Sequence, residues 1–213
     1  MPPQTLEMLL IEQIKDVTDA ISDLKEERGS RMTIKEMEKV KDRMTAQWER
    51  AFAIENKDKV VTFDELGVDA LYIDEADEFK NLFITTSLSH ISGLSHLQGS
   101  DKAFDLFVKV RYLQEQNNGR GVYFATGTPV ANTIAEIYTM QRYMQYDEMK
   151  ARGIHYFDSW ASTFGQVTIG WELDATGVNY KLNSRFSKFQ NVPELTALYR
   201  SFADVVTKED LQR

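Results

Sequence analysis

The chain has 213 residues, of which 42% are hydrophobic and 27% are charged, an ordinary composition for one or two globular units. It contains no cysteine, which excludes disulfides and thiolate metal sites and suits a reducing compartment. The formal net charge of −8 argues against a surface that binds nucleic acid throughout, although it leaves room for a local groove.

The sequence carries no signal for a membrane or for export. It has no apolar run of about 18 residues, and the N-terminus lacks the basic-then-apolar order of a signal peptide. The spacing of His90, His96 and His155 matches no metal-binding motif. We therefore expect a cytoplasmic protein with no membrane partner.

Residues 1–60 have the pattern of a helical hairpin. Apolar residues recur at helical spacing on both sides of a break at Gly29 and Ser30. The first stripe contains Leu10, Ile14, Val17, Ile21 and Leu24, and the second contains Met37, Met44, Trp48 and Ala51. Basic and acidic residues alternate between 35 and 43, which favours a solvated helix face over a phosphate contact. Contact of this arm with DNA, with another domain or with its own copy stays open.

An apolar run that ends in adjacent carboxylates follows at residues 71–81. Leu71, Tyr72 and Ile73 suit a strand covered on both faces, and Asp74 and Glu75 come where that strand stops. The first carboxylate is placed to hold Mg²⁺ through water, and the second to orient or deprotonate the water that attacks a γ-phosphate. The alternative is an acidic turn after a strand.

A second strand and turn are predicted at residues 121–138. A long loop at 85–99 and a helix at 100–116 precede them. The apolar residues 122–124 predict a strand, and Thr126, Gly127, Thr128 and Pro129 form a tight turn. Asn132 is placed to cap the next helix, which runs to about residue 146.

The last quarter predicts a short helix at 157–164, strands at about 166–173 and 180–189, and a helix that begins at Asn191 and Pro193. The second of these strands mixes basic and aromatic residues, which could contact single-stranded nucleic acid. We favour a hairpin that packs its aromatic side chains inward.

The two motifs together resemble motifs II and III of superfamily 2 helicase-like ATPases, most closely of the Swi/Snf type. Asp74-Glu75-Ala76-Asp77 with Lys80 and Asn81 matches motif II, and Thr126-Gly127-Thr128-Pro129 with Asn132 and Glu136 matches motif III. The surrounding sequence is similar to the helicase portion of the large helicase-methyltransferase proteins of phages and conjugative elements.

One residue departs from that pattern. Asp77 stands where the Swi/Snf type usually has His, and the resulting Asp-Glu-Ala-Asp tetrad is shared with DEAD-box RNA helicases. Those proteins normally carry Ser-Ala-Thr as motif III, so the Thr-Gly-Thr-Pro turn favours DNA as the substrate. An RNA helicase fragment stays an alternative.

The phosphate-binding loop of such ATPases is missing from the chain. The sequence has no Gly-x-x-x-x-Gly-Lys-Ser/Thr run, and none of its 11 glycines precedes a lysine. The resemblance therefore implies part of a longer mobile-element protein, without the upstream portion of its lobe and without the second RecA-like lobe. We expect ATP and Mg²⁺ as cofactors of the intact protein, no tightly bound cofactor here, and no efficient hydrolysis by this chain alone.

The resemblance also implies an open sheet edge. The motif III strand normally lies beside the strand that leads into the phosphate loop, and unpaired edges invite pairing with another chain. We expect self-association through that edge, or its coverage by segments of the chain itself. A monomer in sedimentation whose edge strand is open to solvent would contradict both.

The sequence thus predicts an α/β fold: a hairpin at 1–60, then a partial RecA-like P-loop ATPase lobe with a C-terminal hairpin and helix at 61–213. The resemblance implies ATP-driven DNA translocation by the intact protein. It assigns Mg²⁺ binding to Asp74, water orientation to Glu75, coupling to residues 126–128 and support of the motif II loop to Lys80 and Asn81. The alternative class is a non-catalytic interaction module derived from a degenerate helicase lobe.

Overall fold

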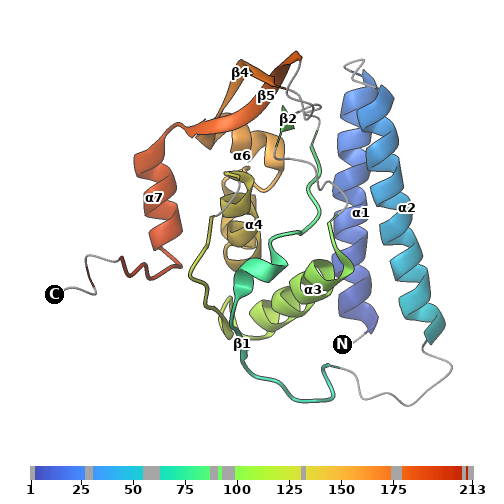
Figure 1. The fold of residues 1–213 in the computed structure, drawn as a ribbon. Coiled ribbons are helices and arrows are strands. Elements are labelled where there is room, and N and C mark those ends of the chain that lie inside the picture. The colour runs from blue at the N-terminus through green and yellow to red at the C-terminus, as the bar shows by residue number, and fades with distance from the viewer. Residues whose placement is uncertain are drawn as a thin grey trace.

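The structure is a computed structural model that describes residues 3–26, 31–54, 63–86, 91–92, 99–130, 133–173, 179–207 and 210. Within these ranges it contains helices, two small sheets and one 3-10 turn (Figure 1). The first half contains α1 (Pro3–Glu26), α2 (Arg31–Ile54), β1 (Leu71–Ile73), η1 (Ala76–Phe79), β2 (Ile91–Ser92) and α3 (Asp101–Gln116). The second half contains β3 (Val122–Phe124), α4 (Ala135–Met144), α5 (Tyr146–Ala151), α6 (Phe157–Phe164), β4 (Gly165–Leu173), β5 (Tyr180–Phe189) and α7 (Val192–Arg200).

The expected N-terminal hairpin is present. Helices α1 and α2 run side by side in opposite directions (Figure 1). They bury the predicted stripes because an apolar residue every three or four positions stays on one face of a helix. The buried members are Leu10, Val17, Ile21, Leu24, Met37 and Met44. The side chains of Trp48 and Ala51 lie outside the described part.

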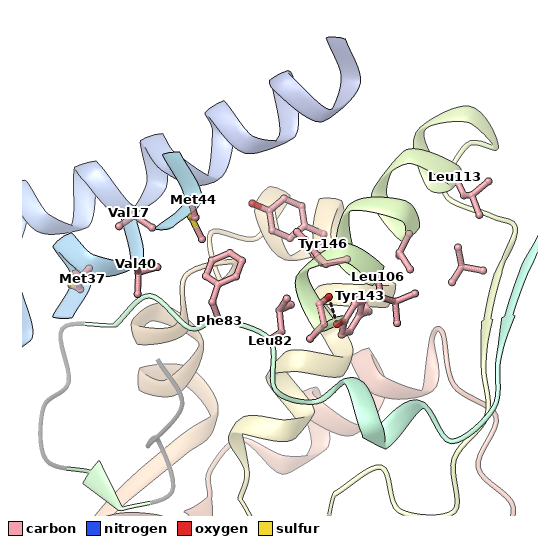
Figure 2. Packing of buried hydrophobic residues seen from close by; sticks show 14 of the residues in the cluster. Val17, Met37, Val40, Met44, Leu82, Phe83, Leu106, Leu113, Tyr143 and Tyr146 are labelled. Carbon is pink, nitrogen blue, oxygen red and sulfur yellow. Dashed lines mark hydrogen bonds between the residues drawn. The ribbon is translucent and has the colours of Figure 1, made fainter. Parts of the chain in front are cut away.

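The hairpin shares a core with the central part of the chain. Val17, Val40 and Met44 lie in the same buried cluster as Phe83 and Tyr143 (Figure 2). The amphipathic helix α3, whose first turn is capped by the Ser100 hydroxyl, contributes a further apolar face to this cluster. The cluster therefore ties together segments that lie more than 100 residues apart in sequence.

Strands β1 and β3 form a two-stranded parallel sheet, with Ile73 opposite Phe124. Helix α3 lies between them in sequence, which makes a β-α-β unit. One face of this sheet packs against the core. Its side chains are buried or half-buried and belong to Leu71, Ile73, Val122 and Phe124. The prediction that β1 is covered on both faces is wrong within the described residues, because Tyr72 is 73% exposed and Tyr123 is 52% exposed.

A second sheet contains the predicted C-terminal hairpin. Strand β5 lies in the middle, antiparallel to β4 and parallel to β2. Strand β2 falls in the segment expected to be a loop, so that expectation is wrong at Ile91–Ser92, while residues 87–90 and 93–98 lie outside the description. Among the described strands none adds to the β1–β3 sheet, so self-association stays a prediction.

A second buried cluster lies beneath β5. It is built on α6, which begins and ends where the sequence predicted, and it buries Phe157, Trp160 and Phe164. Phe186 of β5 contacts the Phe157 ring, and Leu198 of α7 belongs to the same cluster. The fold is thus a mixture of helices and strands with a small parallel sheet, consistent with the α/β class. None of the helices in the described ranges combines the length and apolarity that crossing a bilayer requires.

Candidate functional site

The two candidate motifs lie next to each other at one edge of the β1–β3 sheet. Asp74 directly follows β1, and Thr126 comes two residues after β3. Because paired parallel strands end at the same edge, both segments leave the sheet on that side. Backbone bonds continue past the strands, from Ala125 N to Ile73 O at 2.8 Å and from Ala76 N to Ala125 O at 3.0 Å. These bonds fix the relative position of the two motifs.

The acidic pair presents its side chains to solvent. Asp74 and Glu75 are both exposed, and Glu75 has φ of 52° and ψ of 49°, the left-handed conformation. The left-handed conformation is unfavourable for a residue with a Cβ, and such conformations occur mostly in turns and functional sites. The Glu75 amide donates to Asp74 Oδ1 at 3.0 Å. The turn therefore leaves two adjacent carboxylates open to solvent at the sheet edge.

Asp77 connects motif II to the threonine turn. The Thr126 hydroxyl donates to Asp77 Oδ1 at 2.7 Å and accepts from the Thr128 amide at 3.1 Å. The hydrogen bond from Thr126 is the largest cause that holds the pKa of the Asp77 carboxyl below its ordinary value of 3.8. Asp77, the position that departs from the Swi/Snf pattern, is thus a charged acceptor for motif III.

Lys80 makes a second connection between the motifs. Its ammonium donates to the Thr128 carbonyl and lies 3.2 Å from Glu136 Oε2. The side chains of Lys80 and Glu136 are only 10% and 11% exposed. An ion pair with so little water around it holds a definite geometry, because either charge alone is costly to bury. Lys80 thereby joins η1, the turn at 126–129 and the first turn of α4.

The remaining motif residues occupy different environments. Ala76 is fully buried at the start of η1. Asn81 accepts from the Ser100 amide through its backbone carbonyl at 2.8 Å, and its buried Oδ1 has no hydrogen-bond partner in the described part of the chain. Gly127 is exposed and Pro129 is half-buried. Asn132 lies outside the described residues, but the prediction that it caps the next helix is wrong, because α4 begins at Ala135 with Ile134 at the N-cap position.

The exposed acidic pair fits a magnesium ion that a nucleotide brings with it. Mg²⁺ is commonly held by one or two carboxylates together with water and phosphate oxygens. Asp74 and Glu75 are exposed and adjacent, while the described residues contain no cluster of three or more His, Cys, Asp or Glu side chains that could cage a metal. The donor set therefore suits Mg²⁺ bound largely through phosphate and water.

A buried polar network behind the site was missed at the sequence level. The Arg142 guanidinium donates to the Phe83 carbonyl at 2.5 Å and to Gln13 Oε1 at 3.1 Å, and it lies 4.5 Å from the Phe83 ring centroid. Gln13 also donates to the Tyr146 hydroxyl at 3.0 Å. No local spacing marks these residues, because Gln13 and Arg142 are 129 positions apart.

The fold and the juxtaposed motifs define a helicase-like α/β domain. The chain belongs to the family described as a probable helicase domain, whose model matches residues 3–207. It is 26% identical over 161 residues to the defense against restriction protein B of Escherichia phage P1. That match covers 74% of this chain and 7% of the phage protein. No solved structure matches the chain significantly.

Proposed function

We propose that this domain works within an ATP-driven DNA translocase or helicase of the Swi/Snf-like type, as part of a RecA-like lobe. The observation that carries the proposal is the contact between the two motifs. Asp77 and Lys80 of motif II bind Thr126, Thr128 and Glu136 of the second motif. Such bonds let a change at the carboxylate end of β1 shift the turn after β3.

Each motif residue has a role in this proposal. Asp74 would hold Mg²⁺ through water, and Glu75 would orient or deprotonate the attacking water. The turn at residues 126–128 would couple the state of the nucleotide to movement of the DNA strand. The bound nucleotide supplies the reactive γ-phosphate. Lys80 is a positioning residue, since it contacts the Thr128 carbonyl and Glu136 rather than the exposed carboxylates of Asp74 and Glu75.

The domain needs a phosphate-binding loop from outside these 213 residues. The sequence contains no Gly-Lys-Ser/Thr loop, and positioning together with charge neutralisation supplies most of the catalysis in phosphoryl transfer. The domain also spans only 7% of its phage relative. We therefore propose that an upstream lobe portion and a second RecA-like lobe complete the ATPase, and that the domain alone turns over ATP poorly.

The test is a glutamine substitution in a protein that carries those parts. We expect Glu75→Gln to lower the DNA-stimulated ATPase rate by about 100-fold or more while nucleotide affinity is kept, because the amide cannot accept the water proton. Glu78→Gln is the matched control, since Glu78 is an exposed neighbour that pairs with Lys102 at 2.5 Å. Turnover by Glu75→Gln near the wild-type rate would show that Glu75 does not have this role.

A non-catalytic interaction module derived from a degenerate helicase lobe is the second candidate, and both candidates must account for the phosphate loop that these 213 residues lack. The two candidates predict different sequences upstream of Met1 in the reading frame that encodes the protein. A Gly-Lys-Thr loop encoded upstream of Met1 supports the ATPase, and its absence there supports the module. An RNA helicase is distinguished by stronger stimulation of the complete protein by RNA than by double-stranded DNA.

A further inference from the structure

Strand β4 is a long edge of its sheet. Among the described strands only β5 pairs with it, and the opposite edge of the sheet is β2, which has two residues. β4 has nine residues, and Glu172 is its one charged residue. Proteins usually protect an edge strand by making it short, by charging it or by bending it with a bulge. The register shift of β4 lies between Gln166 and Val167, so residues 167–173 form a regular and nearly uncharged edge.

One face of the β4–β5 ribbon is almost entirely apolar. Residues that pair across two strands lie on the same face, and every second residue of a strand returns to it. Phe186, which pairs with Val167, is 8% exposed and meets the Phe157 ring edge-on at the base of the ribbon. Trp171 is 70% exposed at the far end. On β4 this face holds the alternate positions Val167, Ile169, Trp171 and Leu173.

Gly170 occupies the middle of the regular stretch, three residues from each of its ends. It is not one of the glycines with positive φ, and a Cβ added to it would meet no atom of the described chain within 4 Å. Neither backbone conformation nor crowding among the described residues therefore requires glycine here. Glycine weakens the interior of a strand, and it often marks a place where another backbone approaches closely.

We propose that the edge of β4 binds β4 of a second copy of this chain, antiparallel and about a two-fold axis at Gly170. Such an axis sets each residue opposite the one at the same distance on the other side of the axis. An axis at Gly170 uses the whole regular stretch from Val167 to Leu173 and brings the two glycines face to face. The two three-stranded sheets then join into one continuous sheet.

The residues that meet in this register are complementary. On the apolar face Ile169 lies opposite the partner's Trp171, a β-branched and aromatic pair of the kind that stabilises sheets. On the other face Thr168 lies opposite the partner's Glu172, so no two like charges oppose each other.

Other registers fit less well. An axis at Glu172 sets the two carboxylates against each other, which is unfavourable. An axis between two residues puts the apolar face of one copy beside the polar face of the other, because a shift of one residue exchanges the faces of a strand. The sheet of β1 and β3 offers a shorter edge, since each of these strands has three residues. The pattern of β4 therefore favours a second copy, paired at Gly170.

Sedimentation velocity over a range of concentrations tests the pairing. The wild-type chain should change from monomer to dimer as its concentration rises. We expect Gly170→Lys to raise the dissociation constant of the dimer about tenfold or more, because two ammonium groups then meet at the axis. The monomer should keep its circular dichroism spectrum, since a Cβ at this position has open space. Thr196→Lys adds the same charge at an exposed position of α7 and should leave the dissociation constant unchanged.

Opposite charges at the axis separate pairing from damage to the hairpin. Gly170→Glu should weaken the dimer as Gly170→Lys does, because like charges again face each other. A mixture of the two variants should form heterodimers about tenfold more tightly than either variant forms homodimers, since an ammonium then faces a carboxylate. A damaged hairpin would not recover on mixing.

A single cysteine locates the axis. The chain has no cysteine of its own, so Gly170→Cys introduces one thiol. Opposite residues of an antiparallel pair have Cα atoms about 4.5–5.5 Å apart, which is within the span of a disulfide. Oxidation with diamide should therefore join Gly170→Cys into a covalent dimer, whereas Thr196→Cys should stay monomeric.

Four results overturn the proposal. These are a wild-type chain that is monomeric at every concentration, a dimer that Gly170→Lys leaves intact, no recovery when the lysine and glutamate variants are mixed, and no cross-link in Gly170→Cys. A dimer that Gly170→Lys leaves intact would place the contact on another surface, such as the edge of the β1–β3 sheet. The pairing does not rest on the proposed function, because it needs neither a nucleotide nor Glu75.

Discussion

Lys80 is the residue on which the contact between the motifs most depends. Its ammonium neutralises Glu136 and reaches the Thr128 carbonyl in a region with little water. We expect Lys80→Met to lower the free energy of unfolding by about 2–4 kcal/mol, because it leaves a buried carboxylate without that cation. Urea unfolding followed by circular dichroism measures the loss.

The exposed pair of Lys102 and Glu78 is the control for Lys80. Its side chains are 51% and 64% exposed, so Lys102→Met should cost less than about 1 kcal/mol. Adding Glu136→Gln to Lys80→Met should restore part of the lost stability, since the buried charge is then gone. Equal losses for Lys80→Met and Lys102→Met would mean that burial does not strengthen the first pair.

Thr126 sets the charge state of Asp77. With its pKa lowered in the folded protein, Asp77 adds stability that is present above pH 3.8 and is lost as the pH falls through the folded value. Thr126→Val removes the largest cause of that shift. We expect the Asp77 pKa, followed by carboxyl carbon NMR, to rise toward 3.8, while Thr128→Ser leaves it nearly unchanged. An unaltered Asp77 pKa in Thr126→Val would assign the shift to another group.

At the scale of elements, polar side chains as well as apolar ones join α1 to the rest of the molecule. Asp16 accepts from the Tyr156 hydroxyl at 3.2 Å and the Tyr146 hydroxyl at 3.4 Å, and Glu12 pairs with Lys150. His155 lies beside Tyr156, with 4.0 Å between ring centroids. Partial burial raises the pKa of Asp16 and lowers that of His155. The attachment of α1 should therefore depend on pH.

His155 and Asp16 change the free energy of unfolding in opposite directions as the pH falls. The lowered pKa of His155 gives stability that is present above pH 6.5 and is lost as the pH falls through the folded value. The raised pKa of Asp16 gives stability that is full below pH 3.8 and is lost as the pH rises through its folded value. We expect His155→Phe to reduce the fall in unfolding free energy between pH 7.5 and about 5.5. If the unfolding free energy of His155→Phe had the same pH profile as that of the wild type, His155 would not be the source of the fall.

The elements differ in how far the sequence could predict them. Helices α3 and α6 follow local rules, the Ser100 cap and an aromatic face at helical spacing, and the prediction was correct for both. Strand β2 has two residues and exists only through its pairing with β5, about 90 positions away, so no local pattern marks it. Tyr72 looked buried because apolar runs suit covered strands, but the described neighbours cover one face of β1 only.

The site shows the same division. Adjacent motifs at one sheet edge follow from two parallel strands, so the sequence could predict that Asp74 and Thr126 would be neighbours. The bonds of Lys80 to Glu136 and of Arg142 to Gln13 join positions 56 and 129 apart, and only the folded chain brings them together. The chemical roles of Asp74 and Glu75 stay predictions, which Glu75→Gln tests.

At the scale of the whole molecule, the N-terminal helical hairpin of α1 and α2 shares one core with α3. Met44 of α2 and Leu113 of α3 are buried in the same cluster, at 4% and 1% exposure (Figure 2). A cluster that crosses between segments couples their stability, because neither can separate without exposing apolar surface of the other. An arm that folded by itself would instead keep its own core and its own unfolding free energy.

Hydrogen exchange distinguishes these two cases. We expect Met44→Ala to lower stability by about 2–5 kcal/mol and to reduce the protection of α3 amides as much as that of α1 and α2 amides. Leu113→Ala should do the same from the other side of the core. Met8→Ala, at a position 53% exposed on α1, should change neither set by more than about 0.5 kcal/mol. If Met44→Ala loosened only α1 and α2, the hairpin would be a separately folding arm despite the shared cluster, since coupled segments must lose protection together.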